Sequence, residues 1–506
     1  MNYDVEPIVL NTDDLTAASP GESMWVNRAA AYHMYDAPGV PLCSIMVTGY
    51  NRLNKTKYCV ECILEYTQDV DYELILIDNG SHDGTYDFFQ SVPYNNKQII
   101  KVTKNIGAGY AVNEILKIYR GKYLVSIPND VYVTKNWLSN LLKCYESDVR
   151  IGLVQPVSSN VSNLQQVDLN YKNFDDMQKK SAAFNQSDPS KWEERMRLIT
   201  VAAILSRQII QNVGLVDSAF VHDFIEDDLC ARIRRAGYKL MLCRDTWICH
   251  DHDFRNMEDK NPDEFQKNLE GGRAIYREKY HGIDAWDDIL NFEFTFSELL
   301  KSVRLPSEKP HSLVIDGRCG TPVLEIRNAL RRCGVRDVIS YAFTTQAKYY
   351  HDLQTAADDV KCDRIDFIQS YYADNTFDII ALCEPINIYP RPVTMLQSLY
   401  NFLKPKGVLM FKLRNTDDFN AFLRSAGIGG ISDGDLPAVL PVNEVQECLK
   451  LFGGQDMSIT FEHEGLSDSN QKTLLNLLRS VKSNADKNDL ARLITKNYVF
   501  RVIKKG

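Results

Sequence analysis

Short apolar runs alternate with amphipathic segments along the first part of the chain. Apolar runs of four to eight residues bounded by turn residues are typical of buried strands, and apolar residues at helical spacing are typical of helices. After a first strand that begins at Leu42, the pattern predicts strands at 74–78, 98–104 and 123–127 and helices at 56–68, 85–91 and 107–119. Such alternation predicts a mostly parallel sheet covered on both faces.

The same alternation restarts after residue 311. It predicts strands at 312–316, 337–342, 376–383 and 498–503, and a helix at 323–333. The intervening segment 304–311 holds two prolines and mixed charges, as linkers do. We therefore expect two α/β domains, residues 1–303 and residues 312–506, with residues 1–40 as a polar arm on the first.

Composition limits the classes of protein. A chain of 506 residues is too long for one core, and its 44% hydrophobic and 25% charged residues are those of an ordinary soluble protein. The net charge of -9 argues against a nucleic-acid or anionic-membrane binder. No apolar run approaches the ~18 residues of a membrane span, and the N-terminus lacks the features of a signal peptide.

The cysteines are consistent with an ordinary soluble protein. The twelve cysteines are predicted to be reduced thiols in a cytoplasmic protein. Cys59 and Cys62 form a Cys-x-x-Cys pair, but no second pair lies at zinc-finger spacing. We interpret them as core residues of a helix rather than as metal or redox groups.

Acidic residues follow two of the predicted strands. Asp78 closes the strand at 74–78, and Asp130 follows the strand at 123–127 after Pro128 and Asn129. Parallel strands bring their carboxyl ends to one edge of a sheet, where α/β proteins place their chemistry.

Two later segments complete the pattern. They are Phe-Ile-Glu-Asp-Asp-Leu-Cys-Ala-Arg from residue 224 and Trp-Ile-Cys-His-Asp-His at 247–252; the earlier three lie at 42–52, 73–85 and 123–133. In this order the segments resemble the family 2 glycosyltransferases of the GT-A fold, over roughly residues 41–302. The resemblance implies an inverting enzyme that moves a sugar from a nucleotide-diphosphate donor, most simply a UDP-sugar, to a hydroxyl of a bacterial surface glycan or protein.

The resemblance also implies a divalent cation under the diphosphate. Asp130 matches the last position of the family's Asp-x-Asp motif, while Pro128 stands at its first position. His250 matches a late histidine that completes the metal site, and His252 is its near neighbour. Oxygen ligands suit Mg²⁺ or Mn²⁺, and an imidazole favours Mn²⁺. The alternative is that both histidines are exposed loop residues.

Other residues would bind the donor or the acceptor. Asp78 matches the residue that reads the nucleotide base, and the resemblance places Thr48, Tyr50, Arg52, Asn105, Gly107 and Asn129 around the donor. The alternatives are a surface role for Arg52 and a simple tight turn at Gly107. Segment 160–191 is polar and aperiodic, and is either an acceptor-side flap or a plain insertion.

Three adjacent acids, Glu226, Asp227 and Asp228, are the candidates for the catalytic base. Neighbouring carboxylates repel one another, so their pKa values should be spread, as a base requires. Asp227 is the first choice and Asp228 the second. Asp228 has an alternative partner in Arg232 one turn on, and acids at a helix N-terminus also stabilise the helix dipole.

The second domain resembles the Rossmann-like class I methyltransferases. Its first turn runs from Asp316 to Pro322, and Arg318 and Pro322 stand where that family expects glycine. The second strand ends at Ala342 without the acid that would hold a ribose. We therefore expect weak or absent binding of S-adenosylmethionine. The competing hypotheses are a bifunctional glycosyltransferase and methyltransferase, or a degenerate, non-catalytic assembly subunit; the oligomeric state stays open.

Overall fold

A computed structural model describes the chain as two compact units, Met1–Leu290 and Asn291–Gly506. The described residues are 5–10, 39–107, 109, 112–113, 116, 118–214, 216–217, 219–220, 223–252, 261–418 and 438–506. Most of the predicted N-terminal arm and much of the predicted helix at 107–119 lie outside them. The units divide before the segment predicted as a linker. That segment belongs to the second unit, where Ser307 and the backbone N–H of His311 donate to the buried Asp378.

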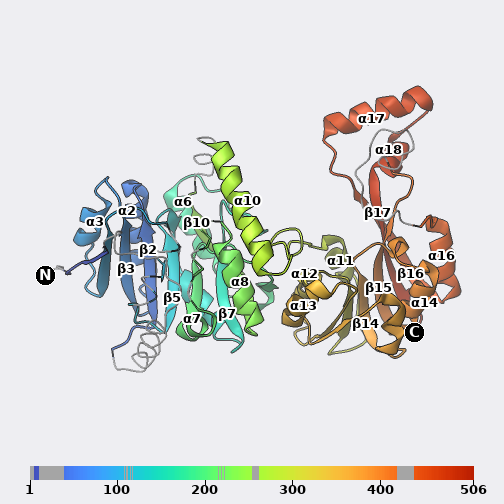
Figure 1. The fold of residues 1–506 in the computed structure, drawn as a ribbon, viewed down its shortest axis with the longest axis horizontal. Helices are drawn as coiled ribbons and strands as arrows, with labels where there is room; N and C mark the ends of the chain where they lie inside the picture. Colours follow the sequence, from blue (N-terminus) through green and yellow to red (C-terminus); the bar gives the residue numbers. More distant parts are fainter. Residues whose placement is uncertain are drawn as a thin grey trace. The chain divides into compact units, whose positions relative to one another are not determined.

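The first unit is built on a mixed sheet with helices packed on it (Figure 1). Its strands are β1 (Ile8–Leu10), β2 (Cys43–Gly49), β3 (Tyr72–Asn79), β4 (Lys97–Val102), β5 (Tyr123–Pro128), β6 (Val131–Tyr132), β7 (Ile151–Ser158), β8 (Trp192–Arg195), β9 (Ala203–Ser206) and β10 (Lys239–His250). Their order is β1-β4-β3-β2-β5-β9-β7-β10-β6, and β8 pairs with β10. Strands β1 to β5 run parallel, and β9 is antiparallel to both of its neighbours.

The helices of this unit pack on a sheet whose side chains form two apolar clusters, a large one and a smaller one around Met46, Ile75 and Ile77. The helices are α2 (Leu53–Tyr66), α3 (Thr85–Ser91), α5 (Trp137–Tyr145), α6 (Phe174–Phe184), α7 (Arg207–Val213), α8 (Ile225–Arg235) and α10 (Pro262–Lys279). Cys59 and Cys62 are buried on α2, as predicted, and all twelve cysteines are free thiols. Every residue of β3 is buried, and this explains the apolar run at 74–77 in its middle.

The polar segment 160–191 contains a helix that the sequence pattern did not predict. Helix α6 begins where the Asn173 side chain accepts a hydrogen bond from the backbone N–H of Asp176. It buries Met177, Gln178 and Ser181, a face too poor in apolar residues to show as periodicity.

The second unit is a doubly wound sheet. Its strands are β11 (His311–Ile315), β12 (Ile339–Thr344), β13 (Asp359–Cys362), β14 (Phe377–Leu382), β15 (Leu403–Arg414), β16 (Gly454–His463) and β17 (Thr495–Lys504). Their order is β13-β12-β11-β14-β15-β17-β16, with β17 antiparallel to both neighbours. The chain direction across the sheet reverses between β11 and β14, the switch point at which such folds bind ligands.

Helices complete the second unit. They are α11 (Phe294–Leu300), α12 (Thr321–Arg332), α13 (Tyr350–Ala356), α14 (Pro392–Phe402), α16 (Val442–Leu451), α17 (Asp468–Val481) and α18 (Lys487–Ile494). The last two form a hairpin between β16 and β17 with a small apolar cluster of their own around Leu474, Leu490 and Ile494 (Figure 1).

Candidate active site

The ends of three parallel strands bring the predicted donor residues to one edge of the first sheet. Gly49 of β2 lies beside Asp78 of β3, and Thr48 lies beside Pro128 of β5. Because β2 lies between β3 and β5, the loops that follow these strands are neighbours. Tyr50, in the first of these loops, is 44% exposed.

A left-handed turn at Asn51 and Arg52 connects these loops. Both residues have positive φ angles, 54° and 60°, and helix α2 begins directly after them. The Asn51 backbone N–H donates to Ser81 (2.8 Å), and its side-chain oxygen accepts from the His82 backbone N–H (3.0 Å). Its carbonyl accepts from Asn129 Nδ2 (3.1 Å). The turn is therefore fixed to the loops after β3 and β5.

Asp78 and Asn105 belong to a second set of braced loops. Asp78 is buried, and its Oδ1 accepts from the Ser81 backbone N–H (3.0 Å). Asn105 accepts from Asn79 Nδ2 (3.2 Å) and from the Gly107 backbone N–H (2.9 Å). The structure therefore brings Asp78 into the same group of loops as Asn105 and Gly107, although these residues are far apart in sequence.

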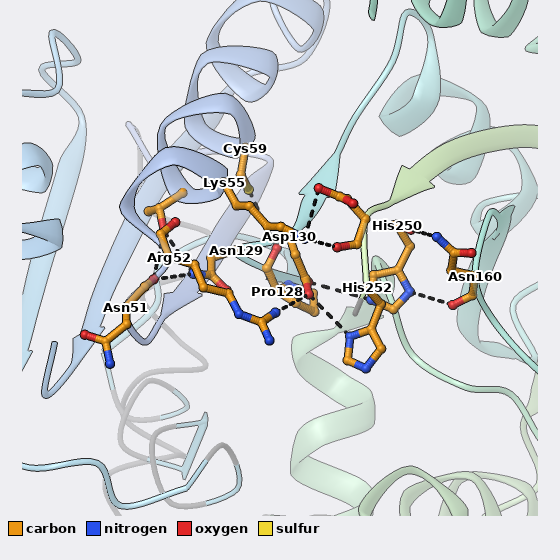
Figure 2. Close-up of polar contacts among 12 residues, drawn as sticks. Asn51, Arg52, Lys55, Cys59, Pro128, Asn129, Asp130, Asn160, His250 and His252 are labelled. Atoms are coloured by element: carbon orange, nitrogen blue, oxygen red, sulfur yellow. Dashed lines mark hydrogen bonds and ion pairs between the residues drawn. The ribbon is translucent and has the colours of Figure 1, made fainter. Parts of the chain in front are cut away.

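Asp130 is the centre of the candidate metal site (Figure 2). Its carboxylate is buried and faces Arg52 Nη1 (3.1 Å), His252 Nδ1 (3.3 Å) and His250 Nε2 (3.7 Å). Burial raises the pKa of Asp130, but the hydrogen bond from His252 and the electrostatic interactions with His250, His252 and Arg52 outweigh burial, so the net pKa lies below its usual range. The carboxylate is therefore ionised at neutral pH.

The residues fit a cation chemically. One ligand atom from each of Asp130, His250 and His252 lies within 4.8 Å of the other two, and a carboxylate with imidazoles is a ligand set for a divalent transition metal. Burial lowers the pKa of His250, although the charge of Asp130 opposes this, so the imidazole is neutral as a ligand must be.

The first residue of the predicted flap takes part in this site. His250 Nδ1 lies 3.0 Å from the carbonyl oxygen of Asn160, and Asn160 Nδ2 donates to the His250 carbonyl (2.9 Å). Ser159 also bonds the His250 backbone, as donor and as acceptor. The orientation of His250 is therefore set by the segment that follows β7.

His252, which was expected only as a neighbour of His250, also lies at Asp130. The available signal was spacing, because residues two apart on an extended chain point to the same side. Asp251, between them, bonds Lys55 (3.0 Å) and Tyr132 (2.9 Å) instead.

The three adjacent acids have different surroundings. Asp227 is buried and forms a two-point ion pair with Arg197. Asp228 is fully buried and bonds Tyr280 Oη (2.7 Å) and Lys279 Nζ (2.6 Å). It also bonds Arg232 Nε (2.8 Å), the alternative partner expected from the sequence. Glu226 is half-buried. Burial raises the pKa of Asp227, and the Arg197 charge opposes this shift.

In the second unit, the turn after its first strand, β11, begins at Asp316, whose carboxylate is fully engaged in hydrogen bonds. This carboxylate accepts from the Thr345 backbone N–H (2.7 Å), the Thr345 hydroxyl (3.0 Å) and the Tyr389 hydroxyl (2.5 Å). Arg318 has a φ angle of 47°. Strand β12 runs to Thr344, two residues past the predicted end at Ala342, because it stays paired with β13 to that point. The residues that follow it are Thr345 and Gln346, so no acid ends this strand.

Comparison with known proteins identifies the first unit. Residues 44–209 match the family Glycosyl transferase family 2. The uncharacterized glycosyltransferase YfnE of Bacillus subtilis is 24% identical over 296 residues, which are 50% of this chain and 74% of the relative. The hyaluronan synthase of Pasteurella multocida is 29% identical over 124 residues, 24% of this chain and 13% of the relative. The chain thus spans only a small part of some relatives.

Two solved structures of low identity are similar to parts of the chain. The mannosyltransferase PcManGT of Pyrobaculum calidifontis, in complex with GDP-Man and Mn²⁺, shows 17% identity and a TM-score of 0.36, and covers 52% of this chain and 74% of that chain. A SAM-dependent methyltransferase from Archaeoglobus fulgidus shows 15% identity and a TM-score of 0.29, and the match covers 46% of this chain and 99% of that chain.

Among the described residues no helix is long and apolar enough to cross a membrane. Residues 44–209, which match that family, therefore form a glycosyltransferase family 2 domain, and the second unit is built on a doubly wound sheet.

Proposed function

We propose that the first unit transfers a sugar, with inversion, from a nucleotide-diphosphate donor to a hydroxyl acceptor, and that Asp130 and His250 hold the divalent cation this reaction needs. The observation that carries the proposal is the buried, ionised Asp130 facing imidazole groups beside the donor loops. A bound Mn²⁺ or Mg²⁺ would offset the charge that develops on the leaving diphosphate.

Arg52 would act on the same leaving group. Its guanidinium lies 3.1 Å from Asp130 and is 38% exposed, so it is held at the site and still reaches solvent. Guanidinium groups bind phosphate oxygens in two-point contacts. Arg52 therefore would hold the diphosphate as the sugar departs.

The nucleotide would lie against the loops after β2, β3 and β4. Asp78 would accept a hydrogen bond from the base, which favours uracil, and Thr48, Tyr50, Asn105 and Gly107 would border it. Asn129 would act indirectly, because its side-chain nitrogen already donates to Asn51 and to Thr56 Oγ1 (2.9 Å).

We propose Glu226 as the base that takes the acceptor's proton. Asp227 neutralises the buried Arg197, and the fully buried Asp228 pairs with Arg232 and Lys279, so removing the charge of either acid would disturb the fold. Glu226 lies in the first turn of the same helix and is more accessible than either. Asp227 and Asp228 remain the alternatives that mutation must separate from it.

The acceptor class rests on the relatives. Matched curated proteins include a hyaluronan synthase and a poly(ribitol-phosphate) beta-glucosyltransferase of Bacillus spizizenii, which supports a bacterial surface glycan as acceptor. A surface protein is the other acceptor to test. We expect the reaction to take place in the cytoplasm.

The second unit would serve as a binding module rather than as a methyltransferase. Asp316 is occupied by Thr345 and Tyr389, Arg318 stands in the turn where the cofactor would approach backbone, and no acid ends β12. We propose that this unit contacts the acceptor or a partner subunit.

A donor panel tests the proposal. The full chain is incubated with Mn²⁺ and a set of UDP-, GDP- and dTDP-sugars, and release of nucleoside diphosphate is measured. We expect release from one donor, with UDP-sugars first, and inverted configuration at the anomeric carbon of the product by NMR. No release from any donor would favour the non-catalytic hypothesis, and a retained configuration would contradict the mechanism.

A further inference from the structure

We propose that a pocket of the second unit, between η5 (Ile365–Ser370) and helix α14, binds a small organic acid whose carboxylate meets Arg391 and whose apolar body enters the pocket. The site is independent of the glycosyl transfer proposed for the first unit. It gives the second unit, whose cofactor turn is altered, a ligand of a different class.

The size of the pocket limits the size of its ligand. Its volume is about 140 Å³. Of the described residues, those that line it come from two segments, 365–369 and 390–398, outside the altered turn at 316–322. Apolar cavities of ~150 Å³ hold a ligand of the size of benzene. The pocket therefore has room for an apolar body of about six non-hydrogen atoms, and a nucleoside would not fit within it.

Apolar side chains form one part of the lining. Ile365, Ile368 and Met395 line the pocket, are buried, and belong to the apolar core of the unit. Side chains packed in a core have few alternative positions, so this part of the pocket is formed before a ligand arrives.

A chain of hydrogen bonds joins the two walls of the pocket. Gln369 of η5 donates through its side-chain nitrogen to Ser398 Oγ, which donates to the Thr394 carbonyl (3.0 Å). Because Ser398 and Thr394 belong to α14, these bonds hold η5 and α14 at a fixed separation. Thr394 is exposed and lines the pocket, so its hydroxyl is placed to donate to a ligand at the entrance.

Two arginines and one aspartate give the entrance a positive charge. Arg391 Nη2 and Arg364 Nη2 lie 2.8 Å and 3.1 Å from the two oxygens of Asp366. The hydrogen bond from Arg391, together with the one from Arg364, holds the pKa of Asp366 below its usual range, so this carboxylate is ionised at neutral pH. Two guanidinium groups share one carboxylate, which leaves one positive charge in excess.

The backbone brings only one of these arginines to the pocket. Arg391 has a φ angle of 52° and directly precedes Pro392, the first residue of α14. A left-handed conformation is uncommon for a residue with a side chain, and such residues are concentrated at ligand sites. Arg391 lines the pocket, whereas Arg364 is not one of the described residues that line it.

These features together favour an acid over a neutral ligand. A guanidinium holds a carboxylate through two parallel, charge-assisted hydrogen bonds. Arg391 uses one nitrogen on Asp366, is 71% exposed, and has further N–H groups for such a contact. A neutral molecule of the same shape would fill the apolar part but gain only the weaker bonds of an uncharged group.

Benzoate and benzamide are the probes, because they share one shape and only benzoate is charged. Saturation-transfer NMR with the full chain at pH 7 measures the dissociation constant of each. We expect wild type to bind benzoate with a dissociation constant of about 1 mM, at least about tenfold tighter than benzamide. Arg391→Ala should weaken benzoate binding by about tenfold and leave benzamide binding unchanged.

Matched variants make the outcome specific. Arg364→Ala removes an equally exposed arginine from the same carboxylate and should bind benzoate as wild type does. Thr394→Phe places a large side chain at an exposed position of the lining and should abolish binding of both probes. Thermal melting of each variant checks that the second unit is folded, and Thr394→Leu repeats the test if the phenylalanine variant is not.

Each other outcome would overturn part of the proposal. Wild type that binds no benzoate, or a folded Thr394→Phe that binds it fully, would overturn the site. Equal affinity for benzoate and benzamide would overturn the acid as ligand class. Equal benzoate affinity in wild type and Arg391→Ala, or the same loss in Arg364→Ala, would overturn the role of Arg391. Sugar transfer by the first unit is tested separately by the donor panel.

Discussion

At the scale of single residues, the neighbouring acids Glu226 and Asp227 lie in different environments. We expect Glu226 to affect catalysis and Asp227 to affect stability. We expect Glu226→Gln to lower sugar transfer by about a hundredfold to ten-thousandfold, the usual effect of losing a general base, with donor KM unchanged. Asp227→Asn should instead lower the stability of the first unit by about 3 kcal/mol, since it leaves Arg197 buried and unpaired.

Transfer kinetics and thermal melting of both variants decide the assignment. Full transfer by a folded Glu226→Gln protein would show that the base lies elsewhere. Loss of transfer by a fully stable Asp227→Asn protein would return the role to Asp227.

A glycine next to Asp78 provides a second test at this scale. Gly80 has a φ angle of 81°, and an added Cβ would lie 2.6 Å from the backbone N of Asn105. Gly237 has a similar φ angle, 90°, with nothing within 4 Å of an added Cβ. We expect Gly237→Ala to cost only about 1 kcal/mol of backbone strain. Gly80→Ala should cost more and raise the donor KM, because the Asn105 loop must move. Thermal melting checks that both variants are folded. Equal donor KM values for folded Gly80→Ala and Gly237→Ala would show that the Asn105 loop does not take part in donor binding.

At the scale of elements, helix α10 is tied to the turn after it by a buried carboxylate. Asp284 accepts from Arg273 (2.7 and 2.9 Å) and Arg277 (2.6 Å), and from two backbone N–H groups of its own turn. Burial raises the pKa of Asp284, but these hydrogen bonds outweigh burial, so its pKa lies well below the usual range. Its stabilising contribution is therefore present above about pH 4 and is lost as the pH falls below it.

Asp284→Asn should lower the melting temperature of the first unit at pH 7, and the difference from wild type should shrink as the pH falls below about 4. Asp287→Asn is the matched control, because Asp287 also bonds Arg273 (2.8 Å) but is 70% exposed. A difference in melting temperature between wild type and Asp284→Asn that stays constant at every pH would show that ionisation of Asp284 does not contribute to stability.

Elements with strong patterns were predicted, and weakly patterned ones were not. Helix α3 was predicted with its observed bounds, and strands β3, β4 and β5 within about two residues, because buried strands leave apolar runs. Strands β7, β9 and β10 of the same sheet were not predicted. Helix α6 escaped because a side-chain cap and a few small or polar buried residues define it. The ion pairs of Asp227 and Asp228 with Arg197 and Lys279 were not predictable, since their partners come from other elements and only the fold brings them together.

At the scale of the whole molecule, the second unit is a doubly wound sheet whose first turn carries Arg318 and Pro322, where a glycine-rich cofactor turn is expected. We expect calorimetry of the full chain with S-adenosylmethionine to show binding no tighter than about millimolar, since the missing backbone approach and ribose contact cost a few kcal/mol and each ~1.4 kcal/mol is tenfold in affinity. S-adenosylhomocysteine is titrated in parallel. A micromolar dissociation constant for either ligand would support the bifunctional hypothesis.

The central claim is that Asp130 anchors a cation that drives departure of the nucleoside diphosphate. The most direct measurement is the rate of diphosphate release from the active donor, with Mn²⁺ and with excess chelator, for wild type, Asp130→Ala and the exposed control Asp69→Ala. We expect chelator to abolish release, Asp130→Ala to lower it by about a hundredfold or more, and Asp69→Ala to match wild type. Undiminished release in excess chelator, or from folded Asp130→Ala, would contradict a cation held by Asp130.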